Sequence, residues 1–212
     1  MEGFGKPSGF YDRQIGTFSA VSNAQSQAAD VDTKEPVGEL PHFGDMVRFF
    51  SNKATQPRDR GTLVHGDYKI DNLIFHKTEP RVIGILDWEM ATVGHPLSDF
   101  CNLTSPYYID GTDHKTEMFQ PGVVAGIPTR DDCVLWYREL AGWDPTPDIP
   151  WGDSFFAWRS SVIMQGIAAR YSLRQASSAR AQEYAQKTKP FALKAWEKVE
   201  RVQKESHQKG KL

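Results

Sequence analysis

Apolar positions recur with a helical period near both ends of this chain and with a strand-like pattern in its middle. Residues 10–29 and 41–54 each place an apolar residue every three or four positions. This spacing predicts two amphipathic helices, separated by a polar connector at residues 30–40. Residues 58–61, which are charged and end in a glycine, are expected to break the second helix.

The middle of the chain reads as short strands. Residues 62–64, 72–75 and 82–86 are runs of β-branched and other apolar residues, and residues 77–80 form a turn that joins the last two runs as a hairpin. In a hairpin the start of one strand meets the end of its partner. We therefore expect the side chains of Asn72 and Asp87 to reach the same edge.

Helices are predicted again in the carboxy-terminal half. A short helix follows Pro96, residues 106–130 are loop-rich, and longer helices are expected at residues 130–143 and 151–174. Pro190 is expected to interrupt the helical tail, because proline cannot donate a backbone hydrogen bond within a helix. The pattern predicts an α+β fold that is mainly α, in one domain over residues 1–212.

Composition excludes several classes of protein. With 212 residues, 39% of them hydrophobic, the chain is long enough to bury a substantial core. A net charge of −2 gives no electrostatic reason to expect nucleic acid or an anionic membrane as partner. No apolar run approaches the roughly 20 residues that span a bilayer. Cys101 and Cys133 are expected to be buried, reduced thiols rather than a disulfide.

The composition favours a cytoplasmic protein. The chain ends in Gly210-Lys211-Leu212, which differs from the Ser-Lys-Leu peroxisomal address at one position. A peroxisomal location is therefore the alternative.

Candidate chemistry is concentrated in the octet that runs from His65 to Asn72, HGDYKIDN, and in the tripeptide DWE that begins at Asp87. The spacing from Asp67 to Asn72 matches the kinase catalytic loop H-R-D-x-x-x-x-N, with Gly66 in place of arginine. Phosphoryl transfer needs a carboxylate beside the attacking hydroxyl and a metal to neutralise charge on the phosphoryl oxygens. The pattern predicts Asp67 as the base and Asn72 and Asp87 as magnesium ligands.

A zinc hydrolase or a binuclear metallophosphatase is the alternative for such a set of residues. Those sites need several imidazole or thiolate ligands that converge on the metal. The six histidines are scattered along the sequence and form no H-E-x-x-H pair, and the two cysteines lie far apart. Carboxylate and amide oxygens suit Mg²⁺ rather than Zn²⁺.

With these motifs, residues 63–108 resemble the superfamily of aminoglycoside phosphotransferases and choline kinases. Within it they are most similar to kinase-like domains found alone or fused to acyl-CoA dehydrogenases, as are Gly5-Lys6-Pro7, residues 11–14 and residues 41–43. The resemblance implies a protein-kinase-like carboxy-terminal lobe whose small β-hairpin carries the catalytic loop. It also implies ATP and Mg²⁺ as cofactors, and a hydroxyl of a small metabolite, such as a hydroxyacyl compound, as acceptor.

The same resemblance assigns roles to individual residues. Asp67 would be the catalytic base, and Asn72 and Asp87 would hold the metal. Glu89 would lie near a second metal or its waters. Asp99 would brace the catalytic loop through hydrogen bonds to its backbone.

Two single residues, one group of acidic residues and one group of aromatic residues each have more than one interpretation. His65 is expected to be structural, with its ring bonded to main chain. Lys69 could contact the γ-phosphate or be solvated, and both alternatives stay open. Aminoglycosides need a strongly acidic cleft, and the acidic residues after position 109 supply a modest one. Of the many aromatic residues, we expect three to form walls of an acceptor pocket: Tyr107, Tyr108 and Trp151.

One departure from the superfamily affects the predicted function. Only 64 residues precede His65, and they contain neither G-x-G-x-x-G nor a V-A-I-K-like strand, the parts that hold ATP in an amino-terminal lobe. We therefore expect a carboxy-terminal lobe without its nucleotide-binding lobe, which is a truncated gene product, a partial gene model or a paralogue that has lost ATP binding. Two functions follow: an incomplete small-molecule kinase, or a catalytically inactive binding module that could oligomerise through the exposed lobe interface.

Overall fold

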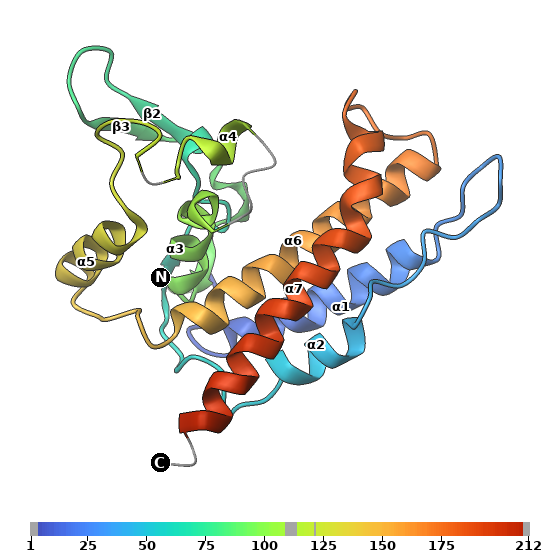
Figure 1. Cartoon of the computed structure of the whole chain (residues 1–212), viewed down its shortest axis with the longest axis horizontal. Helices are drawn as coiled ribbons and strands as arrows, with labels where there is room; N and C mark the ends of the chain where they lie inside the picture. Colours follow the sequence, from blue (N-terminus) through green and yellow to red (C-terminus); the bar gives the residue numbers. More distant parts are fainter. Residues whose placement is uncertain (1–3, 109–113, 121, 210–212) are drawn as a thin grey trace. The chain divides into compact units, whose positions relative to one another are not determined.

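Helices dominate the computed structural model of this chain, which describes residues 4–108, 114–120 and 122–209 (Figure 1). The described helices are α1 Phe10–Ser26, α2 Phe43–Phe50, α3 Leu97–Leu103, α4 His114–Glu117, α5 Arg130–Ala141, α6 Ile149–Ser172 and α7 Ala181–Lys209. The strands are β1 Thr62–Val64, β2 Leu73–Phe75, β3 Val82–Ile85 and β4 Thr92–Gly94. Single 3₁₀ turns are η1 Ile70–Asn72, η2 Trp88–Met90 and η3 Ser105–Tyr107.

The chain divides into two compact units. The first comprises the residues up to Phe10 together with Asp59–Gly152, and the second comprises Tyr11–Arg58 and the residues from Asp153 onward. All strands lie in the first unit, and most of the helical mass lies in the second. The single domain predicted from the sequence stays a prediction.

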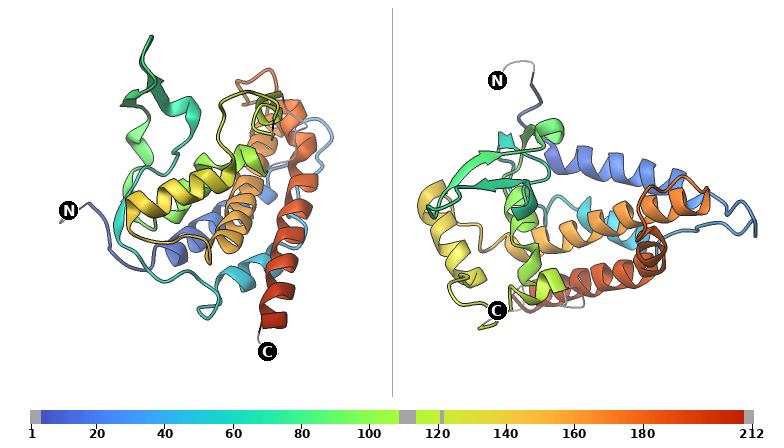
Figure 2. Two further views of the ribbon diagram at one scale, coloured as in Figure 1. Left: turned by 60° about the vertical axis from the view of Figure 1, so that its left-hand side comes forward. Right: turned by 90° about the horizontal axis from the view of Figure 1, so that it is seen from above.

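The second unit is a group of helices around an aromatic core. Figures 1 and 2 show α1, α6 and α7 running alongside one another. The ring of Phe50 lies 5.2 Å from Phe155 and 5.4 Å from Trp158, between ring centroids, and all three side chains are buried. Such edge and tilted contacts add to the stabilisation that comes from burying the rings. All three lie in the ranges 41–54 and 151–174, for which the apolar spacing predicts helices with a buried face.

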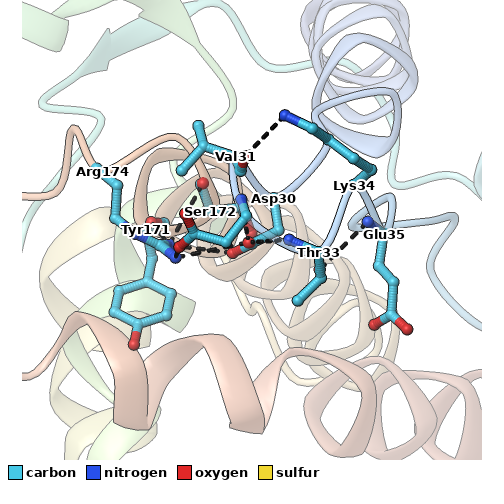
Figure 3. A network of polar contacts seen from close by, with 9 residues as sticks. Asp30, Val31, Thr33, Lys34, Glu35, Tyr171, Ser172 and Arg174 are labelled. Atoms are coloured by element: carbon cyan, nitrogen blue, oxygen red, sulfur yellow. Dashed lines mark hydrogen bonds and ion pairs between the residues drawn. The ribbon is translucent and has the colours of Figure 1, made fainter.

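A polar cluster attaches the connector after α1 to the end of α6 (Figure 3). One carboxylate oxygen of Asp30 accepts the backbone amides of Asp32 and Thr33 at 2.9 and 3.1 Å, and the other accepts Nη1 of Arg174 at 3.0 Å. Arg174 also pairs with Asp32, and the amide of Val31 donates to the carbonyl of Ser172. The connector is therefore held by these contacts together with an isolated antiparallel bridge between Ala29 and Pro36.

The first unit contains two antiparallel sheets of two strands each. β2 pairs with β3, in the hairpin predicted from the sequence, with a register shift between Ile74 and Phe75. β1 pairs with β4, so that Thr62 faces Gly94. β4 was not predicted, because three residues that end in a glycine carry too little pattern to indicate a strand.

Two expectations about the carboxy-terminal helices are wrong. α7 continues through Pro190 without a break, because Ala192, Ala195 and Val199 beyond the proline are fully buried and keep the helix packed. Leu140, expected on the inner face of α5, is 89% exposed. Tyr137, expected on the same face, is partly buried, as is Cys133, and the helix ends at Gly142 as expected.

The remaining general expectations have mixed outcomes. Both cysteines are free thiols; Cys101 is buried, whereas Cys133 is only partly so. Among the described residues, no helix is long and apolar enough to cross a membrane. The carboxy-terminal Gly210-Lys211-Leu212 lies outside the described residues, so the peroxisomal alternative stays a prediction.

The Asp30 cluster leads to a prediction about pH. Backbone hydrogen bonds from Thr33 and Asp32, followed by the bond from Arg174, lower the pKa of Asp30 from 3.8 to about 2. Because the folded pKa is depressed, the stabilisation is complete above pH 3.8 and is lost as the pH falls through about 2. We expect amide hydrogen exchange in residues 30–35 to accelerate over that window.

The variant Asp30→Asn should show faster exchange in residues 30–35 at every pH above 3.8 and no acceleration in the acidic window. Asp45→Asn is the matched control, because Asp45 also pairs with an arginine, Arg48, but outside this connector. Equal exchange in Asp30→Asn and the parent chain would contradict the assignment.

Candidate active site

The loop between β1 and β2 is held at its start by α3. Asp99 accepts two backbone hydrogen bonds, from the amide of His65 at 2.6 Å and from the amide of Gly66 at 2.9 Å. Gly66 has φ of +87°, and a Cβ built there would lie 2.7 Å from the carbonyl oxygen of Met90. Only glycine combines this backbone conformation with so close an approach. The loop therefore has one conformation, set by a carboxylate and a glycine.

His65 is buried and its ring is bonded to the main chain. Nε2 lies 2.7 Å from the carbonyl oxygen of Leu86, and Nδ1 accepts the amide of Asp67 at 3.2 Å. These bonds select the tautomer with hydrogen on Nε2, which donates to Leu86. Nε2 thus ties the loop to the end of the hairpin, and Nδ1 holds the turn within the loop. The ring lies beside Trp88, with 4.7 Å between centroids.

Asp67 is half-buried at the centre of a polar cluster. Its Oδ2 accepts hydrogen bonds from Lys69 Nζ at 2.6 Å and from Asn72 Nδ2 at 3.1 Å, and its Oδ1 accepts Asn102 Nδ2 at 3.4 Å. Burial acts to raise the pKa of Asp67, but the ion pair with Lys69 and the two amide hydrogen bonds outweigh it. The pKa is therefore below its usual value. The carboxylate is ionised at neutral pH.

In the structure Lys69 forms an ion pair with Asp67. This is neither of the two roles considered for Lys69, which were contact with the γ-phosphate and solvation. Asn102 is a member of the cluster that the sequence analysis missed. It lies three residues after Asp99 on α3, so both side chains project from the same face of that helix. Because Asp99 was expected to hold the loop, its spacing from Asn102 could have indicated that Asn102 also faces the loop.

Asn72 and Asp87 lie at the same end of the hairpin. The amide of Leu86 donates to the carbonyl of Asn72 at 2.8 Å, so Asp87 is the next residue beyond this pair. The side-chain nitrogen of Asn72 is used by Asp67, to whose backbone carbonyl it also donates at 2.8 Å. This orientation leaves the amide oxygen of Asn72 without a partner among the described residues.

Two acidic residues that follow β3, Asp87 and Glu89, also lack a partner among the described residues. Asp87 has φ of 61° and ψ of 50°, a left-handed conformation that aspartate adopts more readily than most residues. The side chains of Asp87 and Glu89 are exposed and form no hydrogen bond or ion pair with any described residue. They are therefore available to a ligand.

The donor set formed by these residues fits magnesium. It consists of an amide oxygen from Asn72 and carboxylates from Asp87 and Glu89, all hard oxygen ligands. Among the described residues, no cluster of three or more His, Cys, Asp or Glu side chains could enclose a metal. Mg²⁺ commonly binds through one or two carboxylates and completes its shell with phosphate and water. The site has the composition of such an open position.

A cleft of about 290 Å³ lies next to the loop in the first unit. Its walls are mainly aromatic and aliphatic: Leu63, His65, Tyr68, Ile85, Trp88, Pro96, Asp99, Phe100, Leu103 and Tyr137. The imidazole of His65 and the carboxylate of Asp99 already bond to backbone, and the two tyrosine hydroxyls are the other side-chain oxygen groups in the lining. A larger cavity of about 400 Å³, in the second unit, is lined by none of the predicted site residues.

The three aromatic residues expected to form the acceptor pocket are not walls of the cleft. Tyr108 donates to the carbonyl of Cys101 at 3.2 Å, and the guanidinium of Arg130 lies over its ring. Burial raises the pKa of Tyr107 to about 12, helped by a contact with Cys133. Trp151 is buried at the start of α6. The structure places all three within the protein's own packing.

Comparison with known proteins identifies the family. Residues 4–126 match the phosphotransferase enzyme family, and because this is more than half of the chain, the chain belongs to that family. The fold agrees, because a solved structure from Ralstonia eutropha, provisionally assigned as an aminoglycoside phosphotransferase, superposes with a TM-score of 0.74 at 29% identity. That match covers 94% of this chain and 58% of the other.

Relatives of known sequence include larger proteins. The chain is 30% identical to acyl-CoA dehydrogenase family member 11 of Gallus gallus over 206 residues, which is 95% of this chain and 25% of the relative. It is 30% identical to acyl-CoA dehydrogenase family member 10 of Mus musculus, over 93% of this chain and 18% of the relative. The chain thus spans about a quarter or less of these relatives.

The geometry at Gly66 gives a prediction with a matched control. Gly66→Ala should destabilise the protein, because the new methyl group meets the carbonyl of Met90. Gly126 has nearly the same φ, +86°, but no atom within 4 Å of a built Cβ. Gly126→Ala therefore introduces the backbone strain alone. We expect Gly66→Ala to lose about 1–3 kcal/mol more than this control in urea unfolding. Equal losses would show that the close approach is not a constraint.

The ion pair gives a prediction about Asp67. Lys69→Met should raise the pKa of Asp67, since it removes the strongest of the contacts that lower it. The titration can be followed by carbon-13 NMR of labelled aspartate, with the Asp67 signal assigned by its loss in Asp67→Asn. Lys77→Met, which removes an equal charge from the exposed hairpin turn, should leave the titration unchanged. An unchanged pKa in Lys69→Met would contradict the ion pair.

Proposed function

We propose that this protein acts as a small-molecule phosphotransferase, moving the γ-phosphoryl group of ATP to a hydroxyl of a small metabolite. One observation carries the proposal: an ionised carboxylate, that of Asp67, is fixed by two amides and a lysine. Beside it, at the end of the hairpin, lie oxygen donors that nothing in the described protein uses. This combination is what phosphoryl transfer requires.

Each residue has a distinct task in this mechanism. Asp67 accepts the hydrogen bond of the acceptor hydroxyl, orients it, and takes its proton as the new P–O bond forms. Asn72 holds Asp67 with its nitrogen and offers its oxygen, with Asp87 and Glu89, to the metal. Mg²⁺, when bound with ATP, supplies the charge that neutralises the phosphate oxygens. Lys69 keeps Asp67 ionised.

The cleft supports an acceptor with an apolar segment. Tyr68, which follows Asp67 directly, is one of its walls, and the one carboxylate of the cleft, that of Asp99, already accepts two backbone hydrogen bonds. A polycationic sugar would find no free carboxylate there. Asp132, one of the acidic residues considered for such a sugar, instead forms a capping box with Thr129. A hydroxyacyl compound suits the cleft better, and the names of the relatives in acyl-CoA dehydrogenase families agree with this.

A catalytically inactive binding module is the second candidate. The observation that favours it is in the loop: the carboxylate of Asp67, the proposed base, already accepts hydrogen bonds from Lys69, Asn72 and Asn102. In this case the same cleft would bind the metabolite without turnover. In both candidates we propose a small molecule as the main partner, neither nucleic acid nor membrane, and a cytoplasmic location.

The substitution Asp67→Asn separates the two candidates. With Mg²⁺-ATP and a panel of hydroxyacyl thioesters, we expect acceptor-dependent ADP release by the parent chain and a loss of about 10²–10⁴-fold in the variant, the range for removing a general base. Asp71→Asn, in the same loop but exposed, should retain turnover. An aminoglycoside panel serves as the comparison acceptor.

Thermal unfolding provides the complementary measurement. Mg²⁺-ATP should raise the melting temperature of the parent chain, and the increase should be smaller in Asp87→Asn, which loses a metal ligand. A chain that shows no turnover and no stabilisation by Mg²⁺-ATP, but is stabilised by an acyl compound, would be a binding module. That result would reject the phosphotransferase proposal for this chain.

A further inference from the structure

The larger cavity of the second unit, about 400 Å³, is lined by three segments: residues 37–40 at the end of the connector, the last turn of α6 and the first turns of α7. We call it the α6–α7 cavity. Its volume lies within the range of roughly 300–1,000 Å³ that is usual for small-molecule sites. None of the residues assigned to phosphoryl transfer contributes to its lining. The α6–α7 cavity is therefore a candidate for a second ligand site.

The floor of the α6–α7 cavity is apolar and in part buried. Leu40 and Ala168 are only 3% and 6% exposed. Val37 and Ala185, which are half-buried, belong to the same lining. Apolar side chains in a concave site take up the apolar body of a ligand, because both surfaces leave water on contact.

Hydrogen bonds hold the connector side of the cavity in place. Gln165, which is fully buried, donates from Nε2 to the carbonyl of Gly38 at 2.9 Å, and its Oε1 accepts the hydroxyl of Ser22 at 2.7 Å. The amide of Gly38 donates to the carbonyl of Ser26 at 3.1 Å. A wall that is already fixed in the free protein loses little conformational freedom on binding. The cavity is thus formed before any ligand arrives.

Two opposite charges belong to the lining. Glu39 and Lys189 are exposed, and neither forms a hydrogen bond or an ion pair with any described residue. Other charged residues near the start of α7 are paired among themselves, since Glu183 accepts from both Arg180 and Lys187. The carboxylate of Glu39 and the ammonium group of Lys189 are therefore available to a ligand.

Pro190 leaves a backbone acceptor next to Lys189. Proline has no N–H, so the carbonyl oxygen of Gln186, four residues earlier in α7, receives no hydrogen bond from it. Gln186 is part of the lining, and its side-chain amide also has no partner among the described residues. This turn of α7 can therefore offer both donors and acceptors to a ligand.

These groups restrict the chemical class of the ligand. A polyanion would be repelled by Glu39, and a polyamine would be repelled by Lys189. An uncharged apolar molecule would use the floor but neither charge. A molecule that carries one ammonium group, one carboxylate and an apolar body is complementary to all three parts of the lining.

We propose that the α6–α7 cavity binds a small zwitterion of the amino-acid type, with its ammonium group on Glu39, its carboxylate on Lys189 and its apolar side chain on the floor formed by Leu40, Ala168 and Ala185. The proposal does not rest on phosphoryl transfer, and its test uses no activity.

Isothermal titration calorimetry of the whole chain at low salt, with L-leucine and L-phenylalanine as probes, tests the proposal. We expect saturable binding of one molecule per chain. Two analogues of the second probe each lack one charge: the amide has no carboxylate, and the N-acetyl derivative has no ammonium group. Each should bind about threefold to fivefold more weakly, the range for losing an exposed ion pair.

Charge variants assign each contact. Glu39→Gln should weaken L-phenylalanine about threefold to fivefold but leave the N-acetyl derivative unchanged, because that analogue has no ammonium group to lose a partner. Lys189→Met should show the converse pattern with the amide. Glu35→Gln and Lys204→Met are the matched controls, since both residues are exposed on the same segments but outside the lining. They should leave every affinity unchanged.

Filling the cavity tests its location. Ala185→Phe should abolish binding, whereas Ala20→Phe, at an exposed position of α1 outside the lining, should not. Thermal unfolding of each variant confirms that it is folded. The proposal is overturned if neither amino acid shows saturable binding at millimolar concentration, if the singly charged analogues bind as well as L-phenylalanine, or if the lining variants behave like their controls.

Discussion

The bidentate contact from Asp99 to the backbone of the loop is the interaction on which the site depends. Its two oxygens accept the amides of His65 and Gly66, at the point where the chain leaves β1 and turns sharply. Charge-assisted bonds of this kind contribute about 1.5–3 kcal/mol each. The left-handed conformation of Gly66 then directs Asp67 toward Asn72, and His65 fastens the far side of the loop to Leu86. Every later feature of the site follows from this anchoring.

Polar groups near the loop fall into two sets with different uses. The first set holds the loop and Asp67 in place, and it consists of His65, Asp99, Asn102 and the side-chain nitrogen of Asn72. The amide oxygen of Asn72 and the carboxylates of Asp87 and Glu89 have no partner in the described protein. A stable fold normally satisfies its buried polar groups, and groups left free at one exposed end of a hairpin are available to a ligand. This division supports the phosphotransferase proposal more strongly than any single residue.

Local patterns in the sequence predicted which segments form helices, strands and the catalytic loop. They did not predict the contacts between these elements. The hairpin and the helices follow from alternation and periodicity, each of which operates over a few residues, whereas the bonds of Asp99 were expected from the family resemblance alone. Asn102 could have been inferred from its spacing to Asp99. Pro190 was predicted wrongly because burial of one face of α7 outweighs the loss of one helical hydrogen bond. The aromatic residues Tyr107 and Trp151 could not be placed, since aromatic composition alone does not distinguish a core from a pocket wall.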